Sequence, residues 1–260
     1  MVADRRDLDF TYSLIDRLFR LSLGEQADFS GAKFDGDFSL TLEQAQRRKH
    51  EYVAAQIGIG PERRLLDLGC GWGPLLAYNR DRGGAGVGVT LSAAQLRACR
   101  RHGHDVHLRD ARRVDRDTFG PFDAVASLGA FEHFCSPADH AAGRQEEIYA
   151  GLFANVAGIL PAGGRLYLQT MTFGPNAGDP VHGDVEAPSD SDAHYLGLMA
   201  HQFPGSFLPS GREQIVRTAA PHLQLVESSS GRLDYIETIA RWRRRFAEPG
   251  LRKTLVKARL

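Results

Sequence analysis

Short apolar runs alternate with amphipathic stretches along the middle of the chain. The runs are almost continuously apolar or alternate with a period of two, and they lie at residues 64–69, 84–90, 105–108, 122–128, 165–171 and 223–228. Two helix starts carry capping-box patterns, Thr41-Leu-Glu-Gln44 and Ser92-Ala-Ala-Gln95. Buried strands joined by helical crossovers predict an α/β fold with a doubly wound, mostly parallel sheet. Ligands on such a sheet bind beyond the carboxyl ends of its strands.

Two segments depart from this alternation. Residues 1–58 have helical periodicity, and we expect them to form an N-terminal helical lid. Residues 172–210 form a long connection whose first part, 172–202, is rich in Gly, Pro, Asp and Ser and lacks Lys and Arg. Long connections inside compact domains are usually functional, so we expect an inserted cap there. The prediction is a single domain spanning 1–260 that carries both additions.

Composition limits the class of protein. The chain has 260 residues, 32 basic and 32 acidic side chains and 42% hydrophobic residues, which fits a globular domain and excludes disorder and collagen. There is no apolar stretch of membrane-spanning length and no apolar run at the start, so we expect a cytoplasmic protein. The three cysteines are far apart, which argues against disulfides and a structural metal site.

The balanced total hides a basic end. Residues 241–260 contain eight Lys or Arg and the single acid Glu248, so the rest of the chain is net negative. This end is either a solvated helix face or a surface that contacts phosphate on a lipid surface or carrier. The chain has no extended interleaving of basic and aromatic residues, so we do not expect a nucleic-acid partner.

A glycine-rich turn follows the first strand. It reads Asp67-Leu-Gly-Cys-Gly-Trp-Gly73, and its alternating glycines allow a ligand to approach the backbone. The spacing differs from the dinucleotide fingerprint, in which the third glycine comes later. Asp67 would repel a pyrophosphate but attract an ammonium or sulfonium group. The turn therefore favours S-adenosylmethionine over a nicotinamide cofactor, although a tight strand-to-helix turn would need the same glycines.

Five segments resemble one family. They are Leu65-Leu-Asp-Leu-Gly-Cys-Gly-Trp-Gly73, Val89-Thr-Leu-Ser-Ala-Ala-Gln95, Ser127-Leu-Gly-Ala-Phe-Glu-His-Phe134, Phe203-Pro-Gly-Ser-Phe-Leu-Pro-Ser210 and Asp234-Tyr-Ile-Glu-Thr-Ile-Ala-Arg-Trp242. Together they resemble the class I S-adenosylmethionine-dependent methyltransferases, and within these the cyclopropane fatty acid synthase and mycolic acid methyltransferase group. The likeness covers most of the chain, and the third and fourth segments narrow it to this group.

The resemblance implies a set of cofactor-binding residues. Gly69, Gly71 and Asp67 would lie at the methionine part, and Thr90, Leu91 and Gln95 at the ribose and methionine ends, although Ser92 and Gln95 could simply cap a helix. The family places an acid and its neighbour against the adenine, which here are Asp110 and Ala111, and a surface turn is the alternative. Phe29 and Ser30 match the residues that the family brings over the cofactor from its N-terminal lid.

The resemblance also implies the catalytic residues. Members of the family add a methyl group to an alkene carbon and hold a bicarbonate near the resulting carbocation, using a glutamate, a histidine, a tyrosine and backbone N–H groups. Glu132 matches the glutamate, and its apolar neighbours suggest that it is buried. Tyr235 matches the tyrosine, although its helical stripe with Ile239, Trp242 and Phe246 also suits core packing. His133 could be the base instead, or it could be structural.

Two positions depart from the family pattern. Gln169 stands where the family has its histidine, and Gly31 where it has a cysteine in the N-terminal turn. Glycine keeps the backbone N–H, but an amide cannot carry a proton as imidazole does.

Family chains also continue past the helix of Tyr235, so the strand at 223–228 is expected at an edge of the sheet, open or covered by the basic end.

The sequence therefore predicts a methyltransferase that uses S-adenosylmethionine, and by resemblance bicarbonate, to methylate an alkene carbon of a lipid or another apolar acceptor. The alternative is a C- or N-methyltransferase acting on a small natural product or amine. A nicotinamide dehydrogenase would need an acid after the second strand, where Thr90 and Leu91 stand. A binding module without catalysis is a further alternative.

Overall fold

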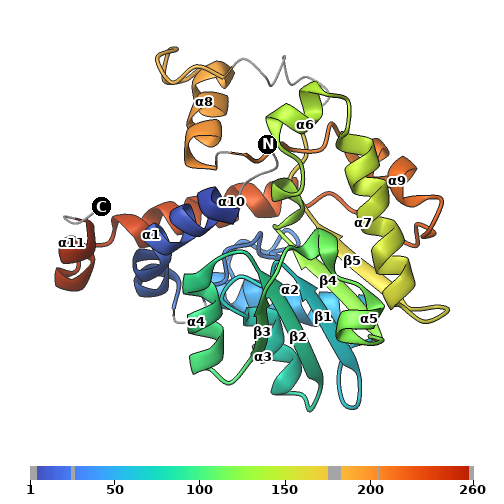
Figure 1. The fold of residues 1–260 in the computed structure, drawn as a ribbon. Coiled ribbons are helices and arrows are strands. Elements are labelled where there is room, and N and C mark those ends of the chain that lie inside the picture. The colour runs from blue at the N-terminus through green and yellow to red at the C-terminus, as the bar shows by residue number, and fades with distance from the viewer. Residues whose placement is uncertain (1–4, 25–26, 175–182, 204, 258–260) are drawn as a thin grey trace.

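The structure is a computed structural model that describes residues 5–24, 27–174, 183–203 and 205–257. Its strands form one parallel sheet in the order β3-β2-β1-β4-β5 (Figure 1). Their bounds are β1 Arg64–Leu68, β2 Ala85–Thr90, β3 Asp105–Leu108, β4 Ala124–Leu128 and β5 Arg165–Gln169. The predicted α/β fold with a parallel, doubly wound sheet is confirmed, and five of the predicted strands lie within one or two residues of their expected ends.

Helices cover both faces of this sheet. One face carries α2 (Leu42–Ile57), α3 (Pro74–Arg80) and α4 (Ala93–Arg101). The other carries η1 (Ala111–Arg113), α5 (Arg116–Phe119), η2 (Phe131–His133), α7 (Gln145–Ile159) and α9 (Arg212–Ala219), and α6 (Pro137–Ala141) lies beyond the end of the sheet before α7. Neighbouring residues of a strand point into opposite cores, as with Leu65 and Leu66. This alternation is why the strands are apolar on both faces.

The strand predicted at 223–228 is wrong. These residues form no strand in the structure, and most of their side chains are exposed, with Val226 at 72%. The segment lies across a cavity from β5, and residues of both line that cavity. A strand needs a hydrogen-bonded partner as well as an apolar pattern, and β5 is the edge of the sheet at this side.

The predicted capping box at the start of α2 is complete, and the one at the start of α4 is half formed. Thr41 and Gln44 form the complete reciprocal box at the start of α2. Ser92 accepts from the backbone N–H of Gln95 at 3.3 Å, but the Gln95 side chain bonds Thr90 instead of closing the box. The Gln95 side chain, which the pattern assigned to the helix cap, therefore accepts a hydrogen bond from Thr90 at the end of β2.

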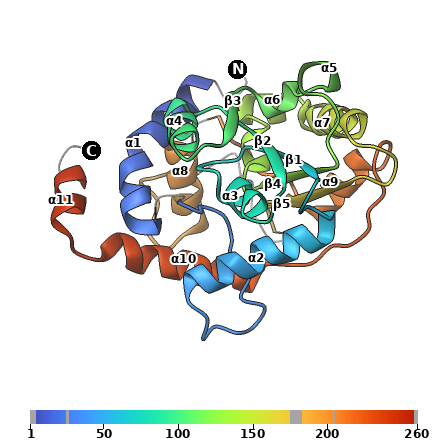
Figure 2. The same ribbon diagram turned by 90° about the horizontal axis from the view of Figure 1, so that it is seen from below.

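A second layer lies over the carboxyl ends of the strands. It consists of α1 (Arg5–Leu23) and α10 (Arg232–Ala247), with α11 (Leu251–Lys257) beside α1. Figure 2 shows α10 running beside α2, where Arg245 pairs with Glu43 at 2.6 Å. Of the predicted stripe on α10, Trp242 is buried while Ile239 is 48% exposed, so the stripe is only partly core.

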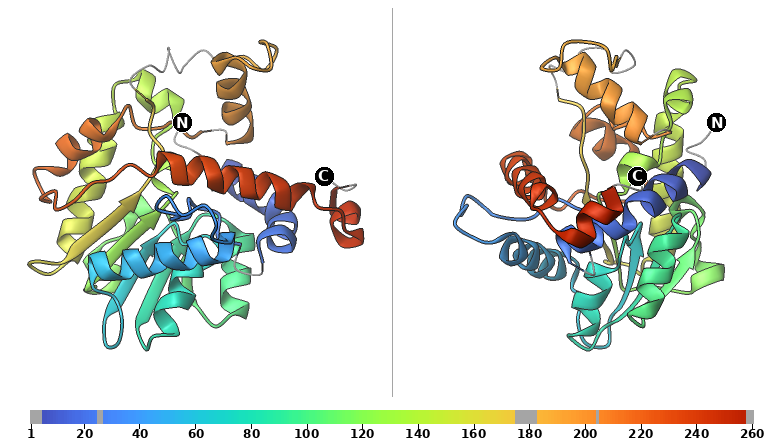
Figure 3. Two further views of the ribbon diagram at one scale, coloured as in Figure 1. Left: turned by 180° about the vertical axis from the view of Figure 1, so that it is seen from behind. Right: turned by 90° about the vertical axis from the view of Figure 1, so that its left-hand side faces the viewer.

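The segment predicted as a cap contains α8 (Asp192–Gln202), which stands apart from the sheet (Figure 3). Part of this segment, including Asp179, lies outside the described residues. The acidic side chains of Asp184, Glu186, Asp190 and Asp192 are exposed, whereas Leu196 and Met199 line the cavity beneath. The segment therefore contributes apolar side chains to the cavity although it is rich in acids, and it also exposes Val185, Tyr195 and Leu198.

Within the described residues, no helix is both long enough and apolar enough to cross a bilayer. Among the described residues, four basic residues of the chain's end form ion pairs within the protein. Arg241 and Arg244 pair with Glu237 at 2.5 and 3.3 Å, Arg245 pairs with Glu43, and Lys253 pairs with Glu248 at 3.9 Å. Such pairs suit a solvated helix face. Contact of this end with a lipid surface or carrier stays a prediction.

Candidate active site

The predicted glycine turn connects β1 to α3. Gly69, Gly71 and Gly73 have φ angles of +80°, +55° and +83°, in the left-handed region that strains other residues. A Cβ on Gly69 would lie 2.3 Å from the Cβ of Ala130, whereas a Cβ on Gly71 would meet nothing within 4 Å. Gly69 thus packs the turn against the segment after β4. Gly71 presents bare backbone to open space, so the turn serves the fold and also leaves room for a ligand.

Asp67 lies at the end of β1 beneath this turn and is 3% exposed. Burial, together with the charge of Asp28, raises the pKa of its carboxyl to about 7, and Lys49 opposes that shift. A buried carboxylate with such a pKa gains from a cation placed against it. This is the position where the sequence predicted a contact with a cationic ligand.

Sequence reasoning missed the ion pair that holds the N-terminal turn. Lys49 of α2 is 1% exposed, and its Nζ donates to both oxygen atoms of Asp28 at 2.8 and 2.9 Å and to Ser30 Oγ at 2.7 Å. Burial lowers the pKa of Lys49 while Asp28 raises it. Burial raises the pKa of Asp28, but Lys49 and His50 outweigh this and hold it below its usual range. The pair fixes Ser30 at the edge of the cavity.

The other predicted residue of this turn, Phe29, lies in an aromatic cluster. Its ring stacks on Trp242 with centroids 4.4 Å apart and contacts Phe19 at 4.5 Å. Phe29 also lines the cavity, as does Ser30. Phe29 therefore connects α1 and α10 to the cavity, which is the position expected of a lid residue.

Thr90, Leu91 and Gln95 follow the end of β2. The Thr90 hydroxyl donates to Gln95 Oε1 at 2.7 Å and accepts from the backbone N–H of Ser92 at 3.1 Å. Thr90 and Gln95 are both buried. The structure thus brings the two predicted polar residues together at the carboxyl edge of the sheet, next to the glycine turn.

Asp110 and Ala111 follow β3. Asp110 caps η1 through the backbone N–H of Arg112, and its carboxylate also accepts from the guanidinium of Arg112 at 2.5 to 3.1 Å. The Ala111 side chain packs into the core. These contacts agree with the surface-turn interpretation, and an adenine contact for this pair stays a prediction.

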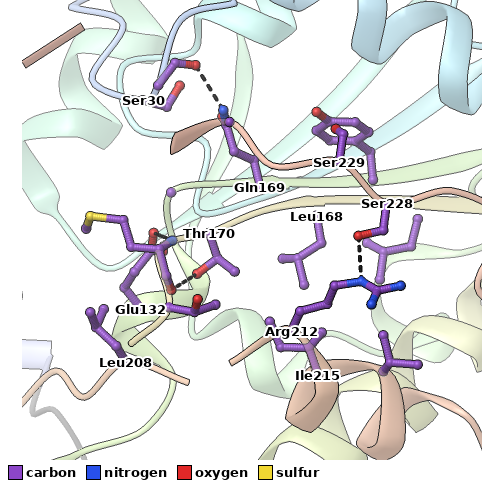
Figure 4. A pocket seen from close by; sticks show the side chains of 18 of the residues that line it. Ser30, Glu132, Leu168, Gln169, Thr170, Leu208, Arg212, Ile215, Ser228 and Ser229 are labelled. Atoms are coloured by element: carbon purple, nitrogen blue, oxygen red, sulfur yellow. Dashed lines mark hydrogen bonds between the residues drawn. The ribbon is translucent and has the colours of Figure 1, made fainter. Parts of the chain in front are cut away.

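A large cavity of about 2790 Å³ runs along the edge strand β5 and past its carboxyl end. Figure 4 shows Glu132, Gln169 and Thr170 at one end of it and Arg212 and Ser228 at the other. The predicted residues that line it are Phe29, Ser30, Glu132, Gln169 and Tyr235. The predicted residues outside its lining are Asp67, Gly69, Gly71, Thr90, Leu91, Gln95, Asp110 and Ala111. The structure therefore separates the predicted set into two groups, at neighbouring strand ends.

Glu132 lies on η2, just after β4, and is 5% exposed. Its Oε1 accepts from the backbone N–H of Met171 at 2.8 Å, while Oε2 has no hydrogen-bond partner among the described residues. Burial raises the pKa of this carboxyl to about 7, although hydrogen bonds from Met171, its own backbone and Thr170 oppose the shift. The predicted burial is confirmed, and the free oxygen atom is the feature that a reaction can use.

Two tyrosines lie near Glu132. Tyr235 packs edge-on against Trp242, and burial and the charge of Glu132 raise its pKa. Tyr12 of α1 was missed by sequence reasoning, and its pKa is raised by burial and by the charges of Glu132 and Tyr235. Both phenols therefore stay protonated. The sequence around Tyr12 has no motif, so its place near Glu132 is seen only in the structure, where α1 packs close to η2.

His133 links three segments. Its Nε2 lies 3.0 Å from the Tyr12 hydroxyl and its Nδ1 lies 2.7 Å from Ser206 Oγ. Burial lowers the pKa of His133 to about 4, so the imidazole is neutral. Hydrogen bonds at both ring nitrogens suit the structural alternative, and the role of His133 stays a prediction.

Gln169 ends β5 and meets the N-terminal turn. Its Nε2 donates to the Gly31 carbonyl at 3.0 Å, and its Oε1 has no partner among the described residues. A Cβ on Gly31 would lie 2.5 Å from a ring carbon of Tyr235 and 3.2 Å from Gln169 Nε2. The two departures from the family pattern are thus in direct contact.

Comparison with known proteins agrees with this architecture. The family model described as "Mycolic acid cyclopropane synthetase" matches residues 2–255. Cyclopropane mycolic acid synthase 2 of Mycobacterium leprae is 33% identical over 206 residues, which are 76% of this chain and 65% of that protein. Hydroxymycolate synthase MmaA4 of Mycobacterium tuberculosis is 28% identical over 91% of this chain and 76% of its own length.

Solved structures are similar over most of the chain. The cyclopropane synthase MmaA2 from Mycobacterium tuberculosis has a TM-score of 0.75 at 27% identity, covering 93% of this chain and 82% of that one. The mycolic acid cyclopropane synthase CmaA1, in a complex with SAH and CTAB, has a TM-score of 0.75 over 94% of this chain and 84% of that one, at 27% identity. The chain spans 65% and 56% of the length of the first two curated relatives that it matches.

Proposed function

Because the chain belongs to the mycolic acid cyclopropane synthetase family of S-adenosylmethionine-dependent methyltransferases, we propose that it transfers a methyl group to an alkene carbon of a lipid or another apolar acceptor. The observation that carries this proposal is the free Oε2 of Glu132, buried at the end of an apolar cavity beside the cofactor turn. Membership of a methyltransferase family argues against the nicotinamide dehydrogenase alternative. The alternative of a binding module without catalysis predicts that no methyl group is transferred.

The cofactor side fits S-adenosylmethionine. Gly71 offers unobstructed backbone, and Asp67 is a buried carboxylate whose pKa is raised to about 7 by burial and by the charge of Asp28. The cofactor supplies an electrophilic methyl group on a sulfonium. In this proposal Asp67, Gly69 and Gly71 hold its methionine part, with Thr90, Leu91 and Gln95 along the ribose. Phe29 and Ser30 close over it, and Asp110 and Ala111 lie toward the adenine.

The acceptor side fits an apolar molecule. Leu168, Phe203, Leu208 and Met199 contribute to its walls, and the described acids of the cap are exposed and are not among the lining residues. A relative of known structure was solved with CTAB, a detergent with a long alkyl chain. An alkene that accepts a methyl cation leaves a carbocation, which needs shielding from water and negative charge nearby. Glu132 is placed to provide that charge, and residues 1–58 and 172–210 would act as lids.

A second candidate is methylation of an amine or a carbon in a small natural product. It is favoured by Gln169 Oε1, which, like Glu132 Oε2, can accept a hydrogen bond from an N–H group. An amine acceptor would use the same cofactor turn. The two candidates differ in the acceptor that gains the methyl group.

The test is incubation with methyl-deuterated S-adenosylmethionine and two acceptor sets, monounsaturated phospholipid vesicles and long-chain alkylamines, followed by mass spectrometry. Label in the unsaturated acyl chain supports the proposal, and label only in the amines supports the second candidate. Glu132→Gln should lose the label, and Glu51→Gln is its matched control, because Glu51 is exposed on α2 and pairs with Arg47 there. Absence of label from both sets, in protein that binds S-adenosylhomocysteine, contradicts methyl transfer.

A further inference from the structure

Two buried oxygen atoms lack a hydrogen-bond donor, and both belong to residues that line the cavity. They are Glu132 Oε2 and Gln169 Oε1, from the ends of β4 and β5, and neither has a hydrogen-bond partner among the described residues. Buried polar atoms are usually paired, so two orphaned acceptors that line one cavity indicate a ligand that supplies positive charge or donors. Both atoms can only accept when Glu132 is ionised.

The orientation of the Gln169 amide is fixed by its neighbour. The Gly31 carbonyl can only accept a hydrogen bond, so the amide group that lies 3.0 Å from it must be the NH₂ end. A flipped amide would place two carbonyl oxygens against each other. The oxygen of Gln169 is therefore the end of the amide that has no partner among the described residues, where a histidine would offer a ring nitrogen that can carry a proton.

The neighbouring turn is closed to a larger side chain. The ring of Tyr235 lies where a side chain on Gly31 would begin, because a Cβ there would be 2.5 Å from Tyr235 Cδ2. Gly31 therefore lets Tyr235 and Gln169 pack directly on the backbone of the N-terminal turn. Gly31 leaves space for the ring of Tyr235, and Gln169 donates a hydrogen bond to the Gly31 carbonyl, so these two positions form one contact.

Bicarbonate, which the family resemblance implies, does not fit these residues. The anion has a single O–H group, so it can satisfy one of the two free acceptors and must turn a charged oxygen toward the other. Tyr235 is protonated and can donate one hydrogen bond, but the glutamate charge and the amide oxygen remain opposed to a second anion. Gln169 donates one of its two N–H bonds to the Gly31 carbonyl, and its amide carries no positive charge that could offset this repulsion.

We infer that this chain works without bicarbonate, and that Glu132 and Gln169 form an oxygen pair that stabilises positive charge directly. The inference rests on the proposed methyl transfer. In the reaction, the π electrons of the alkene form the new C–C bond to the methyl carbon as its C–S bond breaks. The C–S electron pair stays with sulfur, which leaves as the neutral thioether S-adenosylhomocysteine, and the neighbouring alkene carbon becomes cationic. Glu132 Oε2 then takes a proton from the carbon skeleton, and the C–H electron pair closes the new ring or forms a new double bond.

The direct test is a binding titration that needs no acceptor. Sodium bicarbonate is titrated into protein loaded with S-adenosylhomocysteine, with ¹³C-bicarbonate line width and calorimetry as readouts. No binding over a millimolar range is expected in the wild-type chain. Saturable bicarbonate binding to the wild type overturns the inference, whether or not methyl transfer is ever observed.

The Gln169→His variant tests the role of the amide. An imidazole N–H in place of the amide oxygen should strengthen bicarbonate binding by at least about tenfold, the usual worth of one hydrogen bond to a charged group. Equal affinity in both proteins overturns the role given to Gln169. Thermal melts and S-adenosylhomocysteine binding verify that the variant is folded.

The kinetic arm uses buffer purged of carbon dioxide. Added bicarbonate should change wild-type turnover by less than about twofold. Turnover that depends on bicarbonate would contradict the inference while leaving the proposed methyl transfer intact. Conversely, failure of methyl transfer with every acceptor would contradict the proposed function. The bicarbonate titration would then still decide whether the chain binds bicarbonate.

Discussion

The two halves of the site satisfy their polar groups in opposite ways. At the ends of β1 and β2, Lys49 neutralises Asp28 within a hydrogen-bonded network, and Thr90 bonds Gln95. At the ends of β4 and β5, Glu132 and Gln169 each keep one buried oxygen atom without a donor. The first half is prepared for binding, since its groups are already positioned, and the second is prepared for a charge that arises only during reaction.

This difference shows where stability and activity conflict. A paired group such as Lys49 supports the fold, whereas an unpaired buried carboxylate such as Glu132 costs folding free energy. Substitutions in the two halves should therefore have separable effects. Changes on the acceptor side should alter turnover with little loss of stability, and changes on the cofactor side should alter stability and cofactor affinity together.

The largest effect is expected from Glu132→Gln. Loss of the carboxylate removes the charge beside the reacting carbon and the proton acceptor, so turnover should fall about 10²- to 10⁴-fold. Affinity for S-adenosylhomocysteine should stay within about threefold of wild type. Steady-state rates and calorimetry measure both, with Glu51→Gln as the matched exposed change. Unchanged turnover in Glu132→Gln would remove Glu132 from the mechanism.

The next effect is on stability, from Lys49→Met. This change leaves Asp28 as a buried carboxylate with its main counter-charge removed, next to Asp67, and should cost about 3 to 5 kcal/mol of unfolding free energy. Urea unfolding measures the loss. Arg47→Met, which breaks an exposed pair on the same helix, should cost less than about 1 kcal/mol. The account of the cofactor side is wrong if the two variants are equally stable.

A third effect concerns pH. The pKa of Glu132 is about 7 in the folded chain against an ordinary value of 4.5, so folding keeps a proton that the unfolded chain has lost between those values. Its contribution is therefore favourable below the unfolded pKa and is lost as the pH rises through 7, by about 3 kcal/mol. Glu132→Gln should remove that loss, so the variant gains stability relative to wild type between pH 5 and pH 8. Urea unfolding at the two pH values checks this, and a parallel decline in both proteins would contradict it.

The smallest effect is expected at the glycine turn. Gly71→Ala places a methyl group at φ +55° in open space, and should cost about 1 to 2 kcal/mol of stability and weaken cofactor binding about tenfold. Gly103→Ala is the control, since Gly103 has φ +74° and open space but lies in the surface turn before β3. It should show the same strain without the loss of affinity. Equal cofactor affinity in both variants would mean that Gly71 holds no cofactor.

The sequence was sufficient for the features that depend on local pattern. The apolar runs identified β1 to β5, and the apolar neighbours of Glu132 indicated its burial. The run at 223–228 failed because strand formation depends on a partner that the pattern does not reveal. Lys49 and Tyr12 were missed for a related reason. Each is buried by a segment distant in the sequence, so Lys49 on a basic helix looks exposed until Asp28 is placed against it.

The central claim is that the positively charged donor group faces Glu132 across the boundary between the two halves. The most direct measurement is the pKa of Glu132, followed by NMR of ¹³C-labelled glutamate carboxyls and assigned with Glu132→Gln. The account predicts a pKa near 7 in the free protein. It also predicts a clear decrease with S-adenosylmethionine, whose sulfur is cationic, but not with the neutral S-adenosylhomocysteine. The same pKa with both ligands would contradict the claim.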